Sequence, residues 1–351
     1  MKNTSILRKM PKVVVLVIVL CMMFNLAACG ERSNKNTTIA TSSDADKGSE
    51  TGDDTQSTSE TETETVTETE EESSTPEEES TTEENTQGEE ETSANTGNSG
   101  YTDSGFVVND PDNTRGLSET RVGFGCGVAS NGKPHASSVG TQAQIDKFSN
   151  AMALVWDSKT TEKVIYLTFD CGYEYNGNSI KILDVLKEKD VKAAFFCTLP
   201  FLKDNTESVE RMINEGHTVG NHSTTHPSFA TISRSKMASE LWNVHKWLLD
   251  NYNYTCSYFR PPMGEYTESS LDLTTSVGYR SVFWSFAYRD WETANQPSVE
   301  DALETMKNRL HPGEVMLLHA VSDTNVAALG DFIDYAREQG YIFKTLDDYE
   351  W

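Results

Sequence analysis

The chain has 351 residues, and its 55 acidic against 29 basic residues give a net charge of −26. Residues 1–30 carry +4, residues 31–100 carry −18 and residues 101–351 carry −12. Proteins that bind nucleic acid neutralise phosphates with clustered basic residues, so this composition argues against a nucleic-acid partner. The length suits one large domain or two ordinary ones.

Residues 1–29 have the pattern of an export signal. Four basic residues precede an apolar run, Val13 to Phe24, which is shorter than the roughly 20 residues that span a membrane. Leu26-Ala27-Ala28-Cys29 resembles the bacterial lipoprotein cleavage box, which implies that Cys29 is lipidated and anchors the chain to the outer face of the cell membrane. An uncleaved anchor and an ordinary secretory signal stay open as alternatives, and both also place the rest outside the cytoplasm.

Residues 30–100 are predicted to form a disordered acidic linker. Thr, Ser, Glu, Gly and Asn dominate this segment, and Val66 is the one aliphatic residue in its Glu/Thr run. Such a composition buries too little apolar surface to offset the entropy of an ordered chain. We expect a solvated spacer that carries no chemistry.

The six cysteines do not suggest a disulfide framework. After a signal cleavage and lipidation at Cys29, four widely spaced cysteines remain, without C-x-x-C spacing, and a domain of this size does not depend on disulfides. One or two bridges stay open among Cys126, Cys171, Cys197 and Cys256.

Residues 101–160 are predicted to be an N-terminal extension that packs on a barrel formed by residues 161–351. In the latter, runs of β-branched and aromatic residues predict strands at 164–169, 193–196, 217–220, 258–260, 281–286, 315–318 and 341–344. Apolar residues at helical spacing predict helices near 178–186, 209–213, 233–248, 267–277, 298–309 and 325–339.

This alternation predicts an α/β fold with a parallel sheet, either open and doubly wound or closed into a barrel. About 190 residues are few for eight βα units. A distorted (β/α)7 barrel therefore fits better.

Polar side chains follow five of the predicted strands, at the point where each strand ends. The carboxyl ends of parallel strands share one face of a sheet, which is where active sites form. We therefore expect one pocket to collect Asp170, His222, His226, Arg260, Asp290 and His319.

The segment His222-Ser-Thr-Thr-His226 contains two imidazoles that could converge on one metal ion. Gly220, Asn221 and Pro227 place this segment in a loop rather than a helix. Neutral imidazoles suit Zn²⁺ and related divalent ions, and catalytic zinc sites keep a position for water.

Five segments in this order resemble the motifs of the polysaccharide deacetylase family (carbohydrate esterase family 4, the NodB-homology domain). The likeness covers about 163–348 and rests on Thr168-Phe169-Asp170, His222–His226, Arg260–Gly264, Asp290-Trp291 and Leu318-His319. The wording of the motifs is most similar to the branch that deacetylates N-acetylmuramic acid in peptidoglycan on the way to muramic δ-lactam. The resemblance implies a distorted (β/α)7 barrel and a hydrolase that cleaves the linear amide of an N-acetyl group.

The resemblance also implies a role for each motif. Asp170 would be the base that takes a proton from water, and Arg260 would orient it through a bidentate contact. His319 would be the acid that protonates the amine, with Asp290 fixing its tautomer. The backbone N–H of Met263 would stabilise the oxyanion. A divalent metal, expected to be Zn with Co or Mn as alternatives, would bind His222 and His226.

Cys171 departs from the family pattern, which usually has a second Asp after the base as a metal ligand. Three interpretations stay open: a thiolate ligand that favours Zn²⁺, no ligation at all, or a bridge from Cys171 to Cys197. Of the aromatic residues beside the motifs, Trp284 is expected to pack in the core. The candidates for contact with substrate are Tyr173, Tyr175 and Trp291.

The sequence thus predicts an extracellular, monomeric, lipid-anchored hydrolase that removes N-acetyl groups from the N-acetylmuramic acid of peptidoglycan strands. One alternative is the same reaction on N-acetylglucosamine, in peptidoglycan or another glycan. An alternative of another class is a non-catalytic glycan-binding wall protein, against which the combination of a base and an acid argues.

Overall fold

The computed structural model describes residues 101–102 and 104–351. The predicted signal segment 1–29 with its lipidation site Cys29, and the predicted linker 30–100, lie outside the described residues. Within the described part, no helix has both the length and the apolar composition that crossing a bilayer requires.

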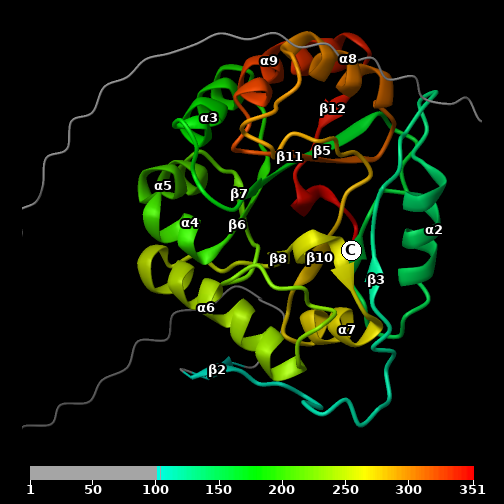
Figure 1. Cartoon of the computed structure of the whole chain (residues 1–351), viewed down its shortest axis with the longest axis vertical. Helices are drawn as coiled ribbons and strands as arrows, with labels where there is room; N and C mark the ends of the chain where they lie inside the picture. The colour runs from blue at the N-terminus through cyan, green and yellow to red at the C-terminus, as the bar shows by residue number, and fades with distance from the viewer. Residues whose placement is uncertain (1–100, 103) are drawn as a thin grey trace, which may run out of the picture. The chain divides into compact units, whose positions relative to one another are not determined.

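The centre of the fold is a parallel sheet of eight strands in the order β11-β5-β6-β7-β8-β10-β4, with β12 beside β5 (Figure 1). All seven strands predicted from the sequence are present. The eighth, β4, comes from the N-terminal extension. Their bounds are β4 Ala153–Leu154, β5 Val164–Cys171, β6 Ala194–Cys197, β7 Thr218–Asn221, β8 Tyr258–Phe259, β10 Arg280–Val282, β11 Glu314–His319 and β12 Ile342–Phe343.

The sheet closes on itself, as the barrel prediction requires. Beyond the end of β10, the backbone N–H of Ser285 donates to Val315 O in β11 (2.9 Å), and Leu317 N–H donates to Phe286 O (2.9 Å). After β4, Asp157 N–H donates to Gly313 O (3.0 Å). These bonds connect the two edges of the sheet and exclude the open, doubly wound alternative. They also explain why β10 is shorter than predicted, since its continuation bonds to β11.

Helices cover the outside of the sheet (Figure 1). Each of the six predicted helices is present. The short α4 and the helix α2 of the extension were not predicted. The helices are α2 Ala136–Ile145, α3 Asn178–Glu188, α4 Leu199–Asp204, α5 Thr206–Asn214, α6 Arg234–Tyr252, α7 Glu268–Ser276, α8 Val299–Arg309 and α9 Asp323–Glu338, with 3₁₀ turns η1 Pro262–Gly264 and η2 Leu346–Asp348.

Strand β5 is buried along its whole length, and its side chains alternate between two environments. Ile165, Leu167 and Phe169 belong to the large apolar cluster between sheet and helices. Val164 and Tyr166 belong to a separate, smaller cluster with residues of β4, β6, β8, β10 and β11. The alternation therefore places Asp170 on the same side of the sheet as Val164 and Tyr166, and Cys171 on the side of the large cluster.

The N-terminal extension does more than pack on the barrel, because some of its residues form strands that pair with those of residues 161–351. Besides supplying β4, it pairs β3 (Val122–Gly123) antiparallel with β9 (Glu265–Tyr266), and it contains the hairpin of β1 (Tyr101–Thr102) and β2 (Gly105–Phe106). The guanidinium of Arg115 donates to Asp272 of α7, which also accepts a bond from the buried Arg234 (2.8 Å). The extension therefore contributes structure to the barrel.

The close approach of β6 and β7 gives a stability prediction. A Cβ added at Gly220 would lie 2.5 Å from Cδ1 of Phe196, a ring held in the buried cluster. We expect Gly220→Ala to lower the free energy of unfolding by about 1–3 kcal/mol, measured by urea denaturation. The matched control is Gly140→Ala in α2, where the Cβ would meet nothing within 4 Å. We expect that change to raise stability by up to about 1 kcal/mol. Equal effects of the two variants would contradict the prediction.

Candidate active site

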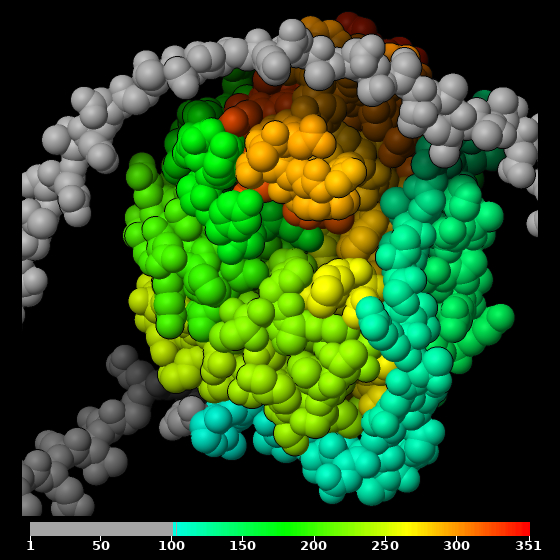
Figure 2. All heavy atoms as spheres, viewed as in Figure 1, coloured from blue at the N-terminus to red at the C-terminus, as the bar shows by residue number. Residues whose placement is uncertain are grey.

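A cavity of about 1010 Å³ opens at the carboxyl ends of the strands. On this face the extension (teal), the segment around residue 263 (yellow) and the segment around residue 290 (orange) come close together (Figure 2). Most of the predicted site residues line the cavity: Asp170, Tyr173, His222, His226, Met263, Trp291 and His319. The expectation that separate strand ends deliver these groups to one pocket is confirmed.

Two other predicted residues, Arg260 and Asp290, lie behind the cavity wall. Both are almost completely buried, and each bonds to a residue that lines the cavity. Asp170 and His319 themselves end neighbouring strands and are paired in register. The candidate base and acid thus stand side by side, each backed by a buried partner of opposite charge.

The buried guanidinium of Arg260 holds the carboxylate of Asp170 on the side away from the cavity. Its Nη1 donates to Asp170 Oδ1 (2.8 Å), and its Nη2 donates to Thr168 Oγ1 (2.8 Å). The remaining donors bond to the carbonyl oxygens of Val282 and Phe283 (3.0 Å each). The predicted bidentate contact with Asp170 is therefore wrong, because the second arm of the guanidinium is used by Thr168. The second carboxylate oxygen of Asp170 is left to face the cavity.

The pKa of Asp170 is set by opposing effects. Burial alone raises it, but the charge of Arg260, followed by those of His222 and His319, outweighs burial and places the pKa below its ordinary value. Asp170 is therefore an ionised carboxylate at neutral pH, which is the form that accepts a proton or neighbours a cation.

The two imidazoles of the His222–His226 loop converge. Nδ1 of His222 lies 2.9 Å from the carbonyl oxygen of Arg260, to which it donates. This leaves Nε2 of His222 as an acceptor, 3.1 Å from Nε2 of His226 and 3.5 Å from Oδ2 of Asp170. Burial lowers the pKa of His222 to about 4 and also lowers that of His226. Both rings are consequently neutral at pH 7.

The loop that carries the two rings is held by its own polar bonds. Ser223 and His226 both have a positive φ (70° and 57°), and the His226 N–H donates to Ser223 Oγ (2.9 Å). Thr225 donates from its backbone N–H and its hydroxyl to the buried carboxylate of Glu240 (2.8 and 3.0 Å). These contacts confirm that the segment is a loop rather than a helix.

This donor set fits a divalent metal. The Nε2 atoms of two neutral imidazoles lie 3.1 Å apart, close enough to bind one ion, and Oδ2 of the ionised Asp170 lies 3.5 Å from Nε2 of His222. Over residues 101–102 and 104–351, no group of three or more His, Cys, Asp and Glu side chains has the arrangement of a metal centre. The chain itself would thus contribute two imidazoles, with water and substrate in the remaining positions.

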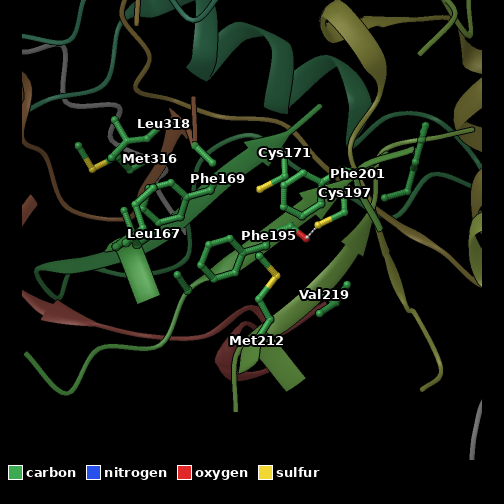
Figure 3. Packing of buried hydrophobic residues seen from close by; sticks show 14 of the residues in the cluster. Leu167, Phe169, Cys171, Phe195, Cys197, Phe201, Met212, Val219, Met316 and Leu318 are labelled. Atoms are coloured by element: carbon green, nitrogen blue, oxygen red, sulfur yellow. Dashed lines mark hydrogen bonds between the residues drawn. The ribbon is translucent and has the colours of Figure 1, made fainter. Parts of the chain in front are cut away.

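Cys171 does not belong to this donor set. It follows Asp170 on β5 and points to the opposite side of the sheet, where it lies fully buried in the apolar cluster with Phe169 and Phe201 (Figure 3). It does not line the cavity, and burial raises the pKa of its thiol. The interpretation of Cys171 as a metal ligand is therefore wrong, for the simple reason that neighbouring residues of a strand face opposite ways.

The proposed bridge from Cys171 to Cys197 is also absent. The two residues are paired in register on β5 and β6, yet both are free thiols. Cys126 and Cys256 are free and buried as well.

His319 is fixed by a buried carboxylate. Its Nδ1 lies 2.7 Å from Oδ1 of Asp290, whose Oδ2 accepts bonds from the His319 N–H (2.8 Å) and from Nδ2 of Asn325 (2.6 Å). Burial lowers the pKa of His319, but the charge and hydrogen bond of Asp290 outweigh it, so the pKa is raised. With Nδ1 bound to the carboxylate, Nε2 carries the proton that the ring can donate.

Met263 lies at the cavity wall in the turn η1, with a left-handed backbone (φ 60°) that is strained for a residue with a side chain. The next residue, Gly264, is also left-handed, and a Cβ there would lie 2.8 Å from the ring of Trp284. The turn is therefore tightly packed, which suits a preorganised donor. The role of the Met263 N–H in binding an oxyanion stays a prediction.

The aromatic candidates separate into two groups. Tyr173 and Trp291 line the cavity and are about half exposed, and the Trp291 ring packs against His319 with 5.5 Å between centroids. Tyr175 does not line the cavity; its carbonyl oxygen accepts a bond from the N–H of Asn178 at the start of α3 (3.0 Å). Trp284 packs on Phe124, as expected for a core residue, and one part of it also lines the cavity.

Several residues of the site were missed at the level of sequence. Thr168 accepts a bond from Arg260, and Asn325 donates to Asp290. Gly125, Cys126 and Gly127 of the extension form part of the cavity wall. Thr168 could have been found, because it lies two residues before Asp170 on the same side of a strand. The wall formed by the extension carries no motif and has no signal in the sequence.

The chain is similar in sequence and in structure to several known deacetylases. The family model for "Polysaccharide deacetylase" matches residues 157–282. The peptidoglycan-N-acetylmuramic acid deacetylase PdaA of Bacillus subtilis is 44% identical over 193 residues, which cover 54% of this chain and 72% of that protein. A peptidoglycan-N-acetylglucosamine deacetylase of Bacillus cereus is 31% identical over 190 residues, covering 52% of this chain and 66% of that protein. The solved structure of B. subtilis PdaA, a family 4 carbohydrate esterase, superposes with a TM-score of 0.62 at 38% identity, over 66% of this chain and 97% of that one.

The contrast between the two imidazoles gives a pH prediction. Since Asp290 raises the pKa of His319, we expect its titration in metal-free protein to have a midpoint above 6.5, the value of an unperturbed histidine, with the proton held below that midpoint and lost above it. Asp290→Asn removes the charge, so the midpoint should fall. His222 should stay neutral down to about pH 4. The measurement is NMR of ¹⁵N-labelled histidine, and an unchanged His319 midpoint in the variant would disprove the assigned cause.

Proposed function

The chain belongs to the polysaccharide deacetylase family, and on that premise we propose that it hydrolyses the N-acetyl group of N-acetylmuramic acid in peptidoglycan. The observation that carries the proposal is the pairing of Asp170 with His319 at the ends of two adjacent strands. Arg260 donates to the carboxylate of Asp170, and Asp290 lies 2.7 Å from Nδ1 of His319. Amide hydrolysis needs a base for water and an acid for the departing amine.

In this mechanism the ionised Asp170 takes a proton from the attacking water, whose oxygen forms a bond to the acetyl carbon. His319 gives its Nε2 proton to the sugar nitrogen as the C–N bond breaks, and acetate and a free amine leave. Arg260 and Thr168 keep the base in place, while Asp290 and Asn325 keep the acid in the required tautomer. We propose that the N–H of Met263, in the turn η1, binds the developing oxyanion.

Enzymes of this family depend on a divalent metal, which polarises the substrate carbonyl and lowers the pKa of water when bound. We propose that His222 and His226 hold this ion here and that Zn²⁺ is the ion that two neutral imidazoles favour, with Co²⁺ or Mn²⁺ as alternatives.

We propose the cell surface as the place of action. The basic and apolar residues before Cys29 support export and lipid anchoring, and the acidic segment 30–100 supports a spacer that lets the catalytic domain reach the wall. Peptidoglycan strands are then the partner, the membrane is reached through the lipid, and the enzyme acts as a monomer.

Deacetylation of N-acetylglucosamine is the second candidate function. It is supported by the 31% identity to a B. cereus enzyme that bears that name. The chemistry at Asp170 and His319 would be the same, so the two candidates differ only in how the sugar is recognised. Mass spectrometry of digested glycan strands separates them, because only one of the two sugars loses its acetyl group.

The base assignment predicts the effect of one substitution. Asp170→Asn keeps the shape of the side chain but cannot accept the proton, and acetate release from peptidoglycan strands should fall about 10²- to 10⁴-fold. The control Asp334→Asn changes an exposed carboxylate of α9 that pairs with Lys189, and it should keep the activity. Binding of glycan without any acetate release by the wild-type chain, with metal supplied, would instead support a non-catalytic wall protein.

The ligand assignment predicts which side chains retain metal. His222→Ala and His226→Ala should each lower the bound zinc, measured by elemental analysis after dialysis, by more than half, because each removes one of the two imidazoles. Cys171→Ala should retain the full metal content, since its thiol faces the opposite side of the sheet. Loss of metal in Cys171→Ala with unchanged unfolding temperature would contradict this assignment.

A further inference from the structure

Among the described residues that line the cavity, one is an Arg or Lys, and the proposed reaction does not use it. Arg289 lines the cavity together with Trp291 and His319, and its side chain is 66% exposed. The other guanidinium at the site, Arg260, is fully buried, and each of its three nitrogens donates to a group of the protein. Arg289 is therefore the guanidinium that a bound substrate can reach.

The backbone around Arg289 is anchored on both sides. The hydroxyl of Tyr288 donates to Asn325, and Asp290 accepts bonds from Asn325 and from His319 (2.6 and 2.8 Å). These contacts attach residue 289 to the same groups that hold the proposed acid. The backbone of residue 289 is therefore held near His319 by hydrogen bonds of both its neighbours.

One edge of the Arg289 guanidinium is unoccupied. Nε donates to Oε1 of Glu292 (2.9 Å), and Nη2 donates to the same oxygen. Within residues 101–102 and 104–351, no other group accepts a bond from this side chain, so the edge formed by Nη1 and Nη2 remains available for a second carboxylate. The pair with Glu292 is exposed and contributes little by itself.

The charge of the cavity also suits an anion. Asp170 is the single acidic residue among the cavity-lining residues described, and it is already paired with Arg260. This is unusual in a chain of net charge −26. A negatively charged group that enters beside Arg289 would meet no unpaired carboxylate of the cavity wall.

N-acetylmuramic acid differs from N-acetylglucosamine by a lactyl ether on C3, which carries a carboxylate. C3 adjoins C2, the carbon that bears the acetamido group, so this carboxylate must lie close to the reacting centre. Resting on the proposed function, we propose that Arg289 binds the lactyl carboxylate and thereby sets the preference of the cavity for N-acetylmuramic acid. A planar fork with one open edge is the arrangement that pairs with a carboxylate through two parallel bonds.

The test compares three substrates for the full chain loaded with zinc. They are peptide-free glycan oligomers with the free lactyl carboxylate, the same oligomers as lactyl methyl esters, and N-acetylglucosamine oligomers. Acetate release gives kcat and KM for each. For the wild-type chain we expect kcat/KM to be highest on the free carboxylate. For Arg289→Gln we expect the ratio of kcat/KM between carboxylate and ester to fall about tenfold, mainly through KM.

Two further variants sharpen the test. Arg289→Lys keeps the charge but loses the fork, and it should recover part of the ratio. Arg337→Gln, which removes an exposed guanidinium of α9 outside the cavity, changes the net charge equally and should leave every ratio unchanged. Unfolding temperatures of all variants report whether the fold is retained.

The outcomes separate this inference from the function on which it rests. Equal wild-type activity on carboxylate and ester, or a parallel loss on both in folded Arg289→Gln, would overturn the role of Arg289 while leaving the deacetylase intact. Absence of acetate release from all three substrates would reject the proposed function itself, and the inference with it.

Discussion

The site depends on one buried guanidinium. Arg260 has no exposed surface, and its bonds join the end of β5, through Asp170 and Thr168, to the segment that leaves β10, through the carbonyls of Val282 and Phe283. A buried cation without partners costs several kcal/mol, so every one of these contacts is needed. Removing any of them would disturb both the closure of the barrel and the position of the base. Stability and chemistry therefore share the same interaction.

Asp170 and His319 are paired residues of adjacent strands, and the fold gives their two side chains different electrostatic environments. The charge of Arg260 lowers the pKa of Asp170, and the charge and hydrogen bond of Asp290 raise the pKa of His319. In a third environment, burial outweighs the charge of Asp170, whose Oδ2 lies 3.5 Å from Nε2 of His222, and keeps that ring neutral. Three titratable groups in one cavity thus have pKa values moved by three different local causes, which is the arrangement that combined base, acid and metal chemistry requires.

The alternation of a β-strand decides which groups take part. Asp170 and Cys171 are neighbours in sequence, yet one faces the cavity and the other lies among the phenylalanines under the helices. The extension shows the converse, because it brings residues that are distant in sequence into the site. Residues 125–127 are far from every motif in sequence, but the pairing of β3 with β9 and the contact of Phe124 N–H with Gly264 O (3.1 Å) bring them to the wall beside Met263. Membership of the site follows from register and packing as much as from chemical type.

The sequence by itself determined the seven strands, the six long helices, the barrel class and the collection of Asp170, His222, His226 and His319 at one edge. These follow from local patterns, namely apolar periodicity and polar residues at strand ends, and from the rule that parallel strands end on the same face. Tertiary structure alone decided the single rather than bidentate bond of Arg260 to Asp170, the exclusion of Cys171 and Tyr175, the contribution of the extension and the free edge of Arg289. Those features depend on contacts between segments far apart in the chain, and no local pattern encodes how close such segments come or which atoms meet.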